Sequence, residues 1–237
     1  MTGPVSEHPA AQSRRVRSFV RREGRLTTGQ RHALESLWPR YGIAPGGGLI
    51  DAAALFGRVA PITLEIGFGN GESLAAQAEQ QPERDFIGIE VHRPGVGHLL
   101  VEIQQRGLNN VRIFNEDAVE VLERRIPPAS LDAVQIFFPD PWHKKRHHKR
   151  RLIQPAFVRM IASRLRPDGL LHLTTDWDDY AAHMESVLAE AGELFSPEGR
   201  QPLEQRPSHR PATRFERRGE HLGHRVSDFL YRRRGGE

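Results

Sequence analysis

In the segment Leu64-Glu65-Ile66-Gly67-Phe68-Gly69-Asn70-Gly71-Glu72-Ser73, three glycines follow directly after a short apolar stretch and precede a helical pattern. Glycine lets the backbone turn sharply and approach a ligand, and the first turn of a helix offers N–H groups to bind one. The spacing is G-x-G-x-G, with Glu72 where the dinucleotide-binding fingerprint requires its third glycine. The segment therefore predicts a strand-to-helix turn beside a ligand site, and its spacing disfavours a nicotinamide-dependent oxidoreductase.

Strand and helix patterns alternate on the carboxyl side of this turn. Such alternation is typical of a parallel sheet covered by helices. The stretch 131–138 is almost continuously apolar, as expected of a strand buried on both faces. We predict an α/β, Rossmann-like domain. Its strands are 62–66, 86–90, 111–114, 131–138 and 170–175, with a late edge strand at 229–231, and its helices are 72–79, 94–105, 118–124, 154–165 and 178–191.

Three regions of different composition divide the chain. Residues 1–16 are polar and contain proline, which predicts a disordered tail. Residues 17–60 form a basic N-terminal segment with Leu34 and Trp38 at helical spacing, and we expect it to pack on the core. Residues 61–237 are expected to form the α/β domain.

The segment Phe137-Phe138-Pro139-Asp140-Pro141-Trp142-His143-Lys144-Lys145-Arg146-His147-His148-Lys149-Arg150-Arg151 joins a strand end to a lone carboxylate and a dense run of cations. Prolines on both sides of Asp140 fix φ and stiffen the loop. In an open α/β sheet, ligands bind at this end of the strands. The run is either a solvated charged face or, beside Asp140, a site that holds a polyanion.

Basic residues are clustered rather than evenly spread. The chain has 237 residues with 34 Lys+Arg against 30 Asp+Glu, a formal net charge of +4. Seven arginines fall between Arg14 and Arg31, six Lys or Arg between Lys144 and Arg151, and five arginines between Arg206 and Arg218. Clusters of this kind, separated by a nearly neutral domain, indicate a nucleic-acid partner.

Several classes of site and location are disfavoured by composition. The absence of cysteine excludes disulfides, a cysteine nucleophile and cysteine-ligated metals. His143 and His147 lie among cations that repel a metal ion, so we predict no metal site. Neither a signal-peptide pattern nor a membrane span is evident, which predicts a cytoplasmic protein without a membrane partner.

Four acidic residues close successive predicted strands. They are Glu65, Glu90, Asp117 and Asp140, and the carboxyl ends of parallel strands meet at one edge of a sheet. Glu90 is placed to accept both hydroxyls of a ribose, and Asp117 to accept an adenine amino group. Each acid alone is commonly a solvated loop residue, but four at one edge predict a nucleoside site.

Together these motifs resemble the bacterial tRNA (guanine-N7)-methyltransferase family, which has a class I S-adenosylmethionine-dependent fold. The resemblance runs from about Arg17 to Tyr231 and implies a mostly parallel seven-stranded sheet with helices on both faces. Its most specific pieces are 64–71, 137–151, Thr174-Thr175-Asp176 and Thr213-Arg214-Phe215-Glu216, supported by Arg17-Ser18-Phe19-Val20-Arg21-Arg22 and Thr28-Gly29-Gln30.

The resemblance also implies roles for individual residues. Asp140 is the expected catalytic residue, and the family's usual target is guanosine 46 of the tRNA variable loop. Arg214 stands where lysine is commoner in the family, which keeps the charge but changes the donor geometry. The cofactor site is expected at Glu65, Gly67, Gly69, Gly71, Glu90, Asp117 and Asp140, the substrate site at Lys144, Asp176, Thr213, Arg214, Phe215 and Glu216, and RNA contacts at Arg146, His147, His148, Lys149, Arg150 and Arg151.

Guanine N7 carries a lone pair and no proton, so its methylation requires no general base, and positioning and electrostatics supply the acceleration. Asp140 either stabilises the developing positive charge or orients the base. Asp176 is either a substrate contact or the N-cap of a helix, and 213–216 either a substrate segment or a surface loop. A tRNA-binding protein without catalysis is the alternative function, and the choice between monomer and homodimer stays open.

Overall fold

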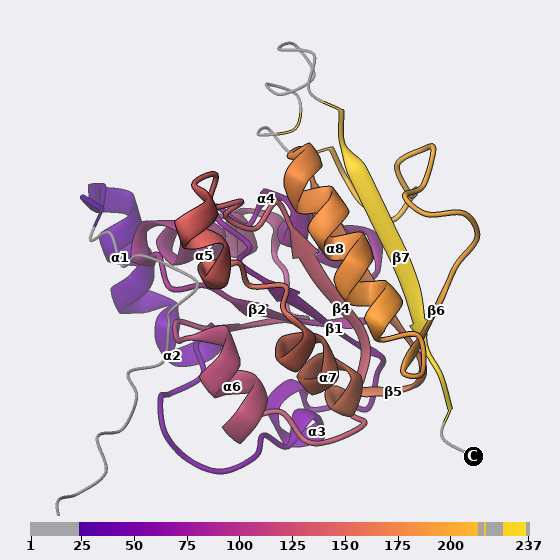
Figure 1. The fold of residues 1–237 in the computed structure, drawn as a ribbon. Helices are drawn as coiled ribbons and strands as arrows, with labels where there is room; N and C mark the ends of the chain where they lie inside the picture. Colours follow the sequence, from indigo (N-terminus) through magenta and orange to yellow (C-terminus); the bar gives the residue numbers. More distant parts are fainter. Residues whose placement is uncertain (1–23, 213–215, 217–224, 236–237) are drawn as a thin grey trace, which may run out of the picture.

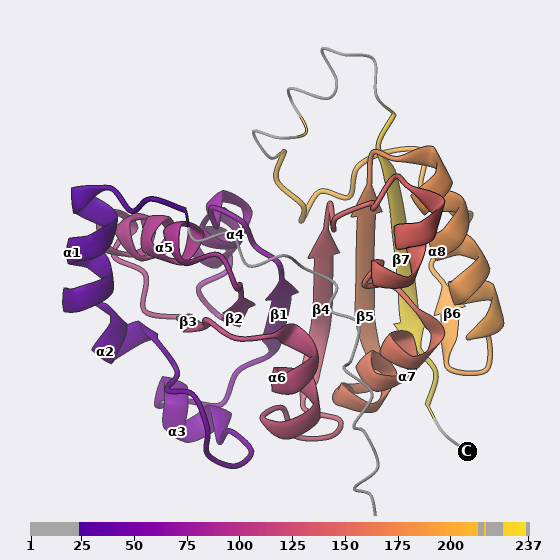
Figure 2. The same cartoon turned by 60° about the vertical axis from the view of Figure 1, so that its left-hand side comes forward.

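The computed structural model describes residues 24–212, 216 and 225–235 of the chain. Within these residues seven strands form one sheet in the order β3-β2-β1-β4-β5-β7-β6, with helices on both faces (Figures 1 and 2). The strands are β1 (Ile62–Ile66), β2 (Asp85–Ile89), β3 (Val111–Phe114), β4 (Leu131–Phe137), β5 (Leu165–Thr175), β6 (Phe195–Pro197) and β7 (Ser227–Arg233). Strand β7 runs antiparallel to its neighbours β5 and β6. The predicted α/β fold with a mostly parallel seven-stranded sheet is confirmed.

The helices follow the predicted alternation with the strands. They are α1 (Thr28–Ser36), α2 (Trp38–Tyr41), α3 (Ala52–Phe56), α4 (Glu72–Gln80), α5 (Arg93–Arg106), α6 (Ala118–Arg124), α7 (Pro155–Arg164) and α8 (Asp178–Glu190), with the 3-10 helix η1 (Lys145–Arg150). Among the helices of the described part, none is both long enough and apolar enough to cross a membrane.

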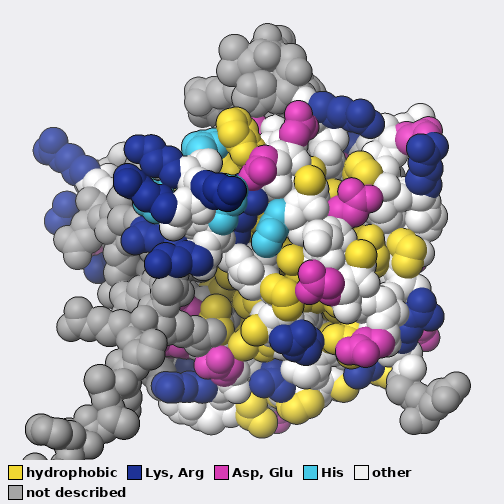
Figure 3. Space-filling model, viewed as in Figure 1, with side chains coloured by type: hydrophobic (Ala, Val, Ile, Leu, Met, Phe, Trp, Pro, Cys, Tyr) yellow, Lys and Arg dark blue, Asp and Glu magenta, His cyan; other side chains and the backbone are white. Residues whose placement is uncertain are grey.

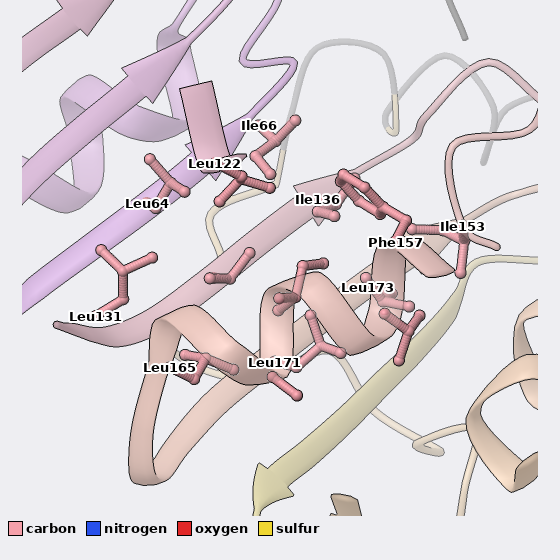
Figure 4. Packing of buried hydrophobic residues seen from close by; sticks show 14 of the residues in the cluster. Leu64, Ile66, Leu122, Leu131, Ile136, Ile153, Phe157, Leu165, Leu171 and Leu173 are labelled. Atoms are coloured by element: carbon pink, nitrogen blue, oxygen red, sulfur yellow. The ribbon is translucent and has the colours of Figure 1, made fainter. Parts of the chain in front are cut away.

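Two apolar cores form on the two faces of the sheet, because alternate residues of a strand point to opposite sides. Phe86 of β2 joins the core formed with α1, α4 and α5, whereas its neighbour Ile87 joins the core formed with α6, α7 and α8. Figure 4 shows part of the second core, where Leu122 and Phe157 from the helices pack against strand residues such as Leu173. Each such buried side chain contributes roughly 1.5–3 kcal/mol, so the two cores fix the sheet edge where the parallel strands end.

The segment before residue 61 packs against the first half of the sheet. Thr27 caps α1 through a capping box, in which the Gln30 N–H donates to Thr27 Oγ1 at 3.2 Å and the Thr27 N–H donates to Gln30 Oε1 at 2.9 Å. A Cβ at Gly97 of α5 would lie 2.9 Å from the Gln30 Cβ, so the glycine permits this helix contact. The predicted tail 1–16 and the basic residues up to 23 lie outside the described residues.

The carboxyl-terminal strands differ most from the prediction. Strand β5 begins at Leu165, which pairs with Leu131, and its register then shifts, so residues 166–169, between the predicted helix 154–165 and the predicted strand 170–175, lie within the strand as an irregularity. Asp168 has a φ of 63° there. Strand β6 has only three residues, too few for a sequence pattern, and it was not predicted.

Candidate active site

A cavity of about 650 Å³ opens at the carboxyl ends of β1, β2 and β4. Its walls come from the glycine turn, from Glu90 and the residues after it, from Glu116 and Ala118 after β3, and from the loop 137–144. This is the edge at which open α/β sheets bind ligands, and the volume suits a small organic cofactor. Parallel topology therefore brings together segments that are far apart in the sequence.

The glycine turn has a backbone that L side chains rarely adopt. Gly67, Gly69 and Gly71 have φ values of 74°, 58° and 79°. A Cβ at Gly71 would lie 2.7 Å from Leu99, so that glycine also lets α5 pack against the turn. A Cβ at Gly67 would meet no heavy atom within 4 Å, and Gly67 lines the cavity. A side chain at Gly67 would therefore take up space that a ligand could use.

Glu90 joins the glycine turn to the end of β2. Its Oε2 accepts from the Gly69 N–H at 2.9 Å, and its Oε1 accepts from the N–H groups of Val91 at 2.7 Å and His92 at 2.9 Å. A carboxylate has about four lone-pair positions, so acceptor capacity is left for a ligand. Glu90 lines the cavity, and these bonds hold its carboxylate in a fixed orientation beside the turn.

Glu65 lies within the sheet layer behind the glycine turn. Its side chain faces Gln77 of α4, whose Nε2 is 3.5 Å from Glu65 Oε2, and only 2% of the residue is exposed. Burial, assisted by the negative charge of Glu90, raises the pKa of Glu65 to about 8. At neutral pH the carboxyl is therefore largely protonated. It is not among the cavity-lining residues of the described structure.

The end of β3 places two acids differently from the prediction. Asp117 is the N-cap of α6, and its Oδ1 accepts from Val119 N at 2.8 Å and Glu120 N at 3.2 Å. Glu116, not Asp117, lines the cavity, and burial raises its pKa. Among the described atoms, its buried Oε1 has no hydrogen-bond partner, although Arg125 lies 3.7 Å away. A buried acceptor at the cavity wall fits a ligand that donates an N–H.

The loop that carries Asp140 is held in an unfavourable conformation. Phe138 and Trp142, on either side of Pro139-Asp140-Pro141, have φ values of 51° and 47°, and neither is a glycine. Such conformations cost on the order of 1–3 kcal/mol each and cluster at functional sites. The Phe138 N–H donates to Thr174 O at 2.9 Å, which ties the loop to β5. Asp140 is exposed and lines the cavity.

Arg151 differs from its predicted role as an RNA contact. Its side chain is only 2% exposed and pairs with Asp179 of α8. The Nε–H donates to Pro141 O at 2.9 Å, and the guanidinium lies 4.8 Å from the centre of the Tyr180 ring. These partners bury the charge, because α8 covers this position in the folded chain. Arg151 braces the Asp140 loop instead of presenting its cation to a polyanion.

Apart from Lys144, which precedes it, the other cations of the run lie on η1 at the surface beside the cavity. Arg146 and Lys149 are exposed. The guanidinium carbon of Arg150 lies over the Trp142 ring, 5.0 Å from the ring centre. Figure 3 shows lysines and arginines gathered at the upper left of the molecule, with histidines beside them. His147 lines the cavity, and desolvation together with the cations Arg146 and Arg150 lowers its pKa. His148 is half-buried, 3.7 Å from Asp179.

The predicted substrate residues are placed only in part. Lys144 is exposed and lines the cavity, and Asp176 directly follows β5. The N-cap of α8 is Trp177, so the interpretation of Asp176 as a helix cap is wrong. Thr213, Arg214 and Phe215 lie outside the described residues. Glu216 is buried, and its carboxylate accepts from Arg210 at 2.7 and 2.8 Å.

Two further aromatic residues lie at the site, and neither was predicted as a cofactor, substrate or RNA contact. His143 lines the cavity, and its ring centre lies 4.1 Å from that of the half-exposed Trp177. The signal was the position of Trp177 two residues after β5, at the same sheet edge as Asp140. In the part of the chain that the structure describes, no three His, Asp or Glu side chains are grouped as metal ligands.

Solved methyltransferases share this fold. The 16S rRNA methyltransferase KamB superposes with a TM-score of 0.56 at 18% identity, covering 80% of this chain and 96% of that one. An rRNA methylase from Streptococcus thermophilus gives a TM-score of 0.50 at 16% identity, covering 74% of this chain and 88% of that one. At such identities the likeness concerns the fold alone.

Sequence relatives are much closer. A family model described as "Putative methyltransferase" matches residues 59–229. The tRNA (guanine-N(7)-)-methyltransferase of Methylococcus capsulatus is 58% identical over 222 residues, 93% of this chain and 95% of the relative. That of Alkalilimnicola ehrlichii is 58% identical over 235 residues, 95% of each chain. With a methyltransferase sheet, a cavity at its carboxyl edge and this identity over nearly its whole length, the chain belongs to the S-adenosylmethionine-dependent tRNA (guanine-N7)-methyltransferase family.

Proposed function

We propose that this chain transfers the methyl group of S-adenosylmethionine to N7 of guanosine 46 in the variable loop of tRNA. The single observation that carries the proposal is the cavity of about 650 Å³, which has Asp140 in its wall and the cationic helix η1 directly beside it. A pure RNA-binding protein has no use for carboxylates next to phosphate, so this arrangement favours an enzyme over a binding module.

The residues of the cavity fit the cofactor. Gly67 leaves room at the turn, Glu90 is oriented to accept from ribose hydroxyls, and Glu116 offers a buried acceptor for an N–H donor. When bound, S-adenosylmethionine supplies a methyl group on a positively charged sulfur. We assign Glu65, Gly69, Gly71 and Asp117 a supporting role, because they shape the turn and the start of α6 around this space.

Asp140 would act through its charge and its position. Positive charge passes to the guanine as N7 is methylated, and a carboxylate beside it stabilises that charge. No proton has to leave N7, so Asp140 need not act as a base. The strained loop, held by Thr174 and Arg151, keeps the carboxylate in one place, and a fixed charge stabilises a transition state without reorganising.

The guanine and its RNA would be held by groups around the cavity mouth. Lys144 and Asp176 offer a donor and an acceptor for the edge of the base, together with the segment 213–216. The RNA backbone would meet the cationic surface of η1, where phosphate contacts supply affinity without reading sequence. In that surface we include Arg146, His147, His148, Lys149 and Arg150, and we leave out the buried Arg151.

The test is mass spectrometry of nucleosides after an unmodified tRNA transcript is incubated with the protein and S-adenosylmethionine. N7-methylguanosine should form. A transcript with adenosine in place of guanosine 46 should stay unmethylated, as should one with 7-deazaguanosine, which has carbon in place of N7. Methylation of the adenosine transcript would refute the position. Methylation of the 7-deazaguanosine transcript would refute the acceptor atom.

A further inference from the structure

Trp177 exposes an aromatic side chain at the carboxyl edge of the sheet. It follows β5 by two residues, and 37% of the residue is exposed. The other exposed large apolar side chains of the described residues are Leu49 and Val59, which both precede β1. A single exposed apolar residue is ordinary in a folded protein, so the neighbours of Trp177 decide whether it has a role.

The neighbours of Trp177 belong to the wall of the cavity and to the loop of Asp140. The His143 ring lines the cavity, and its centre lies 4.1 Å from that of Trp177, with 66° between the ring planes. An edge contact of this kind holds the indole in one orientation. Asp179, two residues further along the chain, pairs with Arg151, which braces the Asp140 loop. Trp177 therefore lies beside that loop, at the edge of the cavity.

The fold does not require an indole at position 177. Trp177 is the N-cap of α8, but its side chain makes no capping hydrogen bond. Its backbone N–H donates to Thr175 Oγ1 at 3.3 Å, a bond that any residue except proline can make. Trp177 belongs to neither apolar core of the described residues. Its exposed ring surface is therefore available to a ligand.

A nucleobase is the ligand whose chemistry matches this surface. An enzyme that modifies a base takes it out of its stack, and an aromatic side chain replaces the stacking that is lost. A phosphate matches it poorly, because the carboxylate of Asp176 directly precedes Trp177 in the chain. Trp177 therefore differs from the cationic surface of η1, which matches the RNA backbone.

The charge of the target base changes during the reaction. The N7 lone pair forms the new bond to the methyl carbon, the electrons of the S–C bond pass to sulfur, and the positive charge moves from sulfur to guanine. A cation is attracted to the face of an aromatic ring, and tryptophan attracts it most strongly. An indole stacked on the guanine therefore holds it more tightly as the methyl group is transferred.

We propose that Trp177 stacks on the target guanine and stabilises the positive charge that develops on it. The inference rests on the proposed function, because it takes guanine to be the base and N7 to be the acceptor atom. Asp140 and Trp177 then stabilise the same charge, the first through its carboxylate and the second through its ring face. An interaction that strengthens in the transition state raises kcat, so turnover should depend on the indole.

The experiment compares two variants at the site with one control. Trp177→Leu keeps an apolar side chain but removes the ring, and Trp177→Phe keeps a smaller ring. The control is Trp38→Leu, which makes the same change in α2, where the indole packs against the core formed with α1, α4 and α5. Trp38→Leu should lower the thermal unfolding temperature, whereas the two variants at Trp177 should keep it.

The measurement is the affinity of each protein for tRNA with and without the N7-methyl group, in the presence of S-adenosylhomocysteine. Phosphate contacts are the same in both tRNAs, so the ratio of the two affinities reports on the base. In Trp177→Leu the preference for methylated tRNA and kcat should each fall by roughly two- to thirtyfold, the range expected for loss of a cation–π contact. Trp177→Phe should lie in between, and Trp38→Leu should keep the ratio and kcat of the unmodified protein.

The outcomes separate the inference from the proposed function. If the unmodified protein forms no N7-methylguanosine, the proposed function fails and the inference falls with it. If the unmodified protein is active and Trp177→Leu keeps its affinity ratio, the indole does not sense the charge of the guanine, and the inference is overturned whatever happens to kcat. An equal fall of the ratio in Trp38→Leu overturns it as well. If Trp177→Leu does not fold, Trp177→Phe decides, since an unchanged ratio in that variant also overturns the inference.

Discussion

The Nε–H of Arg151 donates to the carbonyl oxygen of Pro141 at 2.9 Å, which ties the end of the cationic run to the loop that carries Asp140. Asp179 of α8 pairs with the same guanidinium and leaves it almost entirely buried. The last cation of the run therefore differs in function from its neighbours. Arg151 fixes the geometry of the site, whereas the exposed cations of η1 give the surface its positive charge.

Arg151→Gln should lower the unfolding temperature and kcat, because Asp179 and the Pro141 carbonyl both lose their charged donor. Losing a hydrogen bond to a charged group costs roughly 1.5–3 kcal/mol. The dependence of tRNA affinity on salt should stay unchanged, because a buried cation neutralises no phosphate. Thermal unfolding and binding titrations between about 50 and 200 mM salt check both parts. A flatter salt dependence would show that Arg151 reaches the RNA.

The double variant Arg146→Gln and Lys149→Gln should leave the unfolding temperature unchanged and should weaken the dependence of tRNA affinity on salt. Both side chains are exposed on η1, so the fold should tolerate the change. Each lost phosphate contact lowers the slope of log affinity against log salt by roughly 0.7–0.9, so the pair should lower it by about 1.4–1.8. The affinity for every tRNA should fall by about the same factor, because phosphate contacts do not read the sequence. An unchanged slope in the same titrations would mean that η1 is only a solvated charged face.

Glu90→Ala should weaken cofactor binding more than tRNA binding. Two lost hydrogen bonds to a ribose suggest a cost of about 1–3 kcal/mol in calorimetry with S-adenosylmethionine. The variant also leaves the N–H groups of Gly69, Val91 and His92 without this acceptor, so some stability should be lost. Glu79→Ala, which removes an exposed acid paired with Arg106, is the control and should bind the cofactor normally. Equal cofactor affinity in both variants would remove Glu90 from the site.

Much of this site was predictable, because parallel topology decides which residues share an edge. Glu90 and Asp140 end or follow strands whose pattern is clear, and both line the cavity. The sequence could not distinguish Glu116 from its neighbour Asp117, since the choice depends on which side chain the turn into α6 directs inward. Arg151 was misjudged for a similar reason: Asp179, which buries its charge, lies 28 positions later in the chain.

Glu65 should make stability depend on pH. Its pKa is raised from 4.5 to about 8 in the folded protein, so between these values the folded state binds more protons than the unfolded state. Stability should then fall as pH rises from 4.5 to about 8, by up to about 1.4 kcal/mol per pH unit, and the loss should be complete above 8. Glu65→Gln removes this ionisation, so urea unfolding at pH 6 and 8.5 should show a smaller loss for the variant. An equal loss in both proteins would contradict the raised pKa.

Asp140→Asn tests whether the carboxylate acts by charge. The amide keeps the size and an acceptor oxygen but carries no charge, so base orientation would largely survive and charge stabilisation would not. Because positive charge develops on guanine during transfer, we expect kcat to fall on the order of 100-fold, with tRNA and cofactor affinities nearly retained. Asp178→Asn changes the net charge equally at an exposed position in the first turn of α8, and it should keep normal turnover. Single-turnover kinetics at saturating tRNA and cofactor separate the chemical step from product release. If Asp140→Asn turns over normally while Asp140→Ala does not, the residue orients the base through a hydrogen bond, and the charge of the strained loop has no part in the rate.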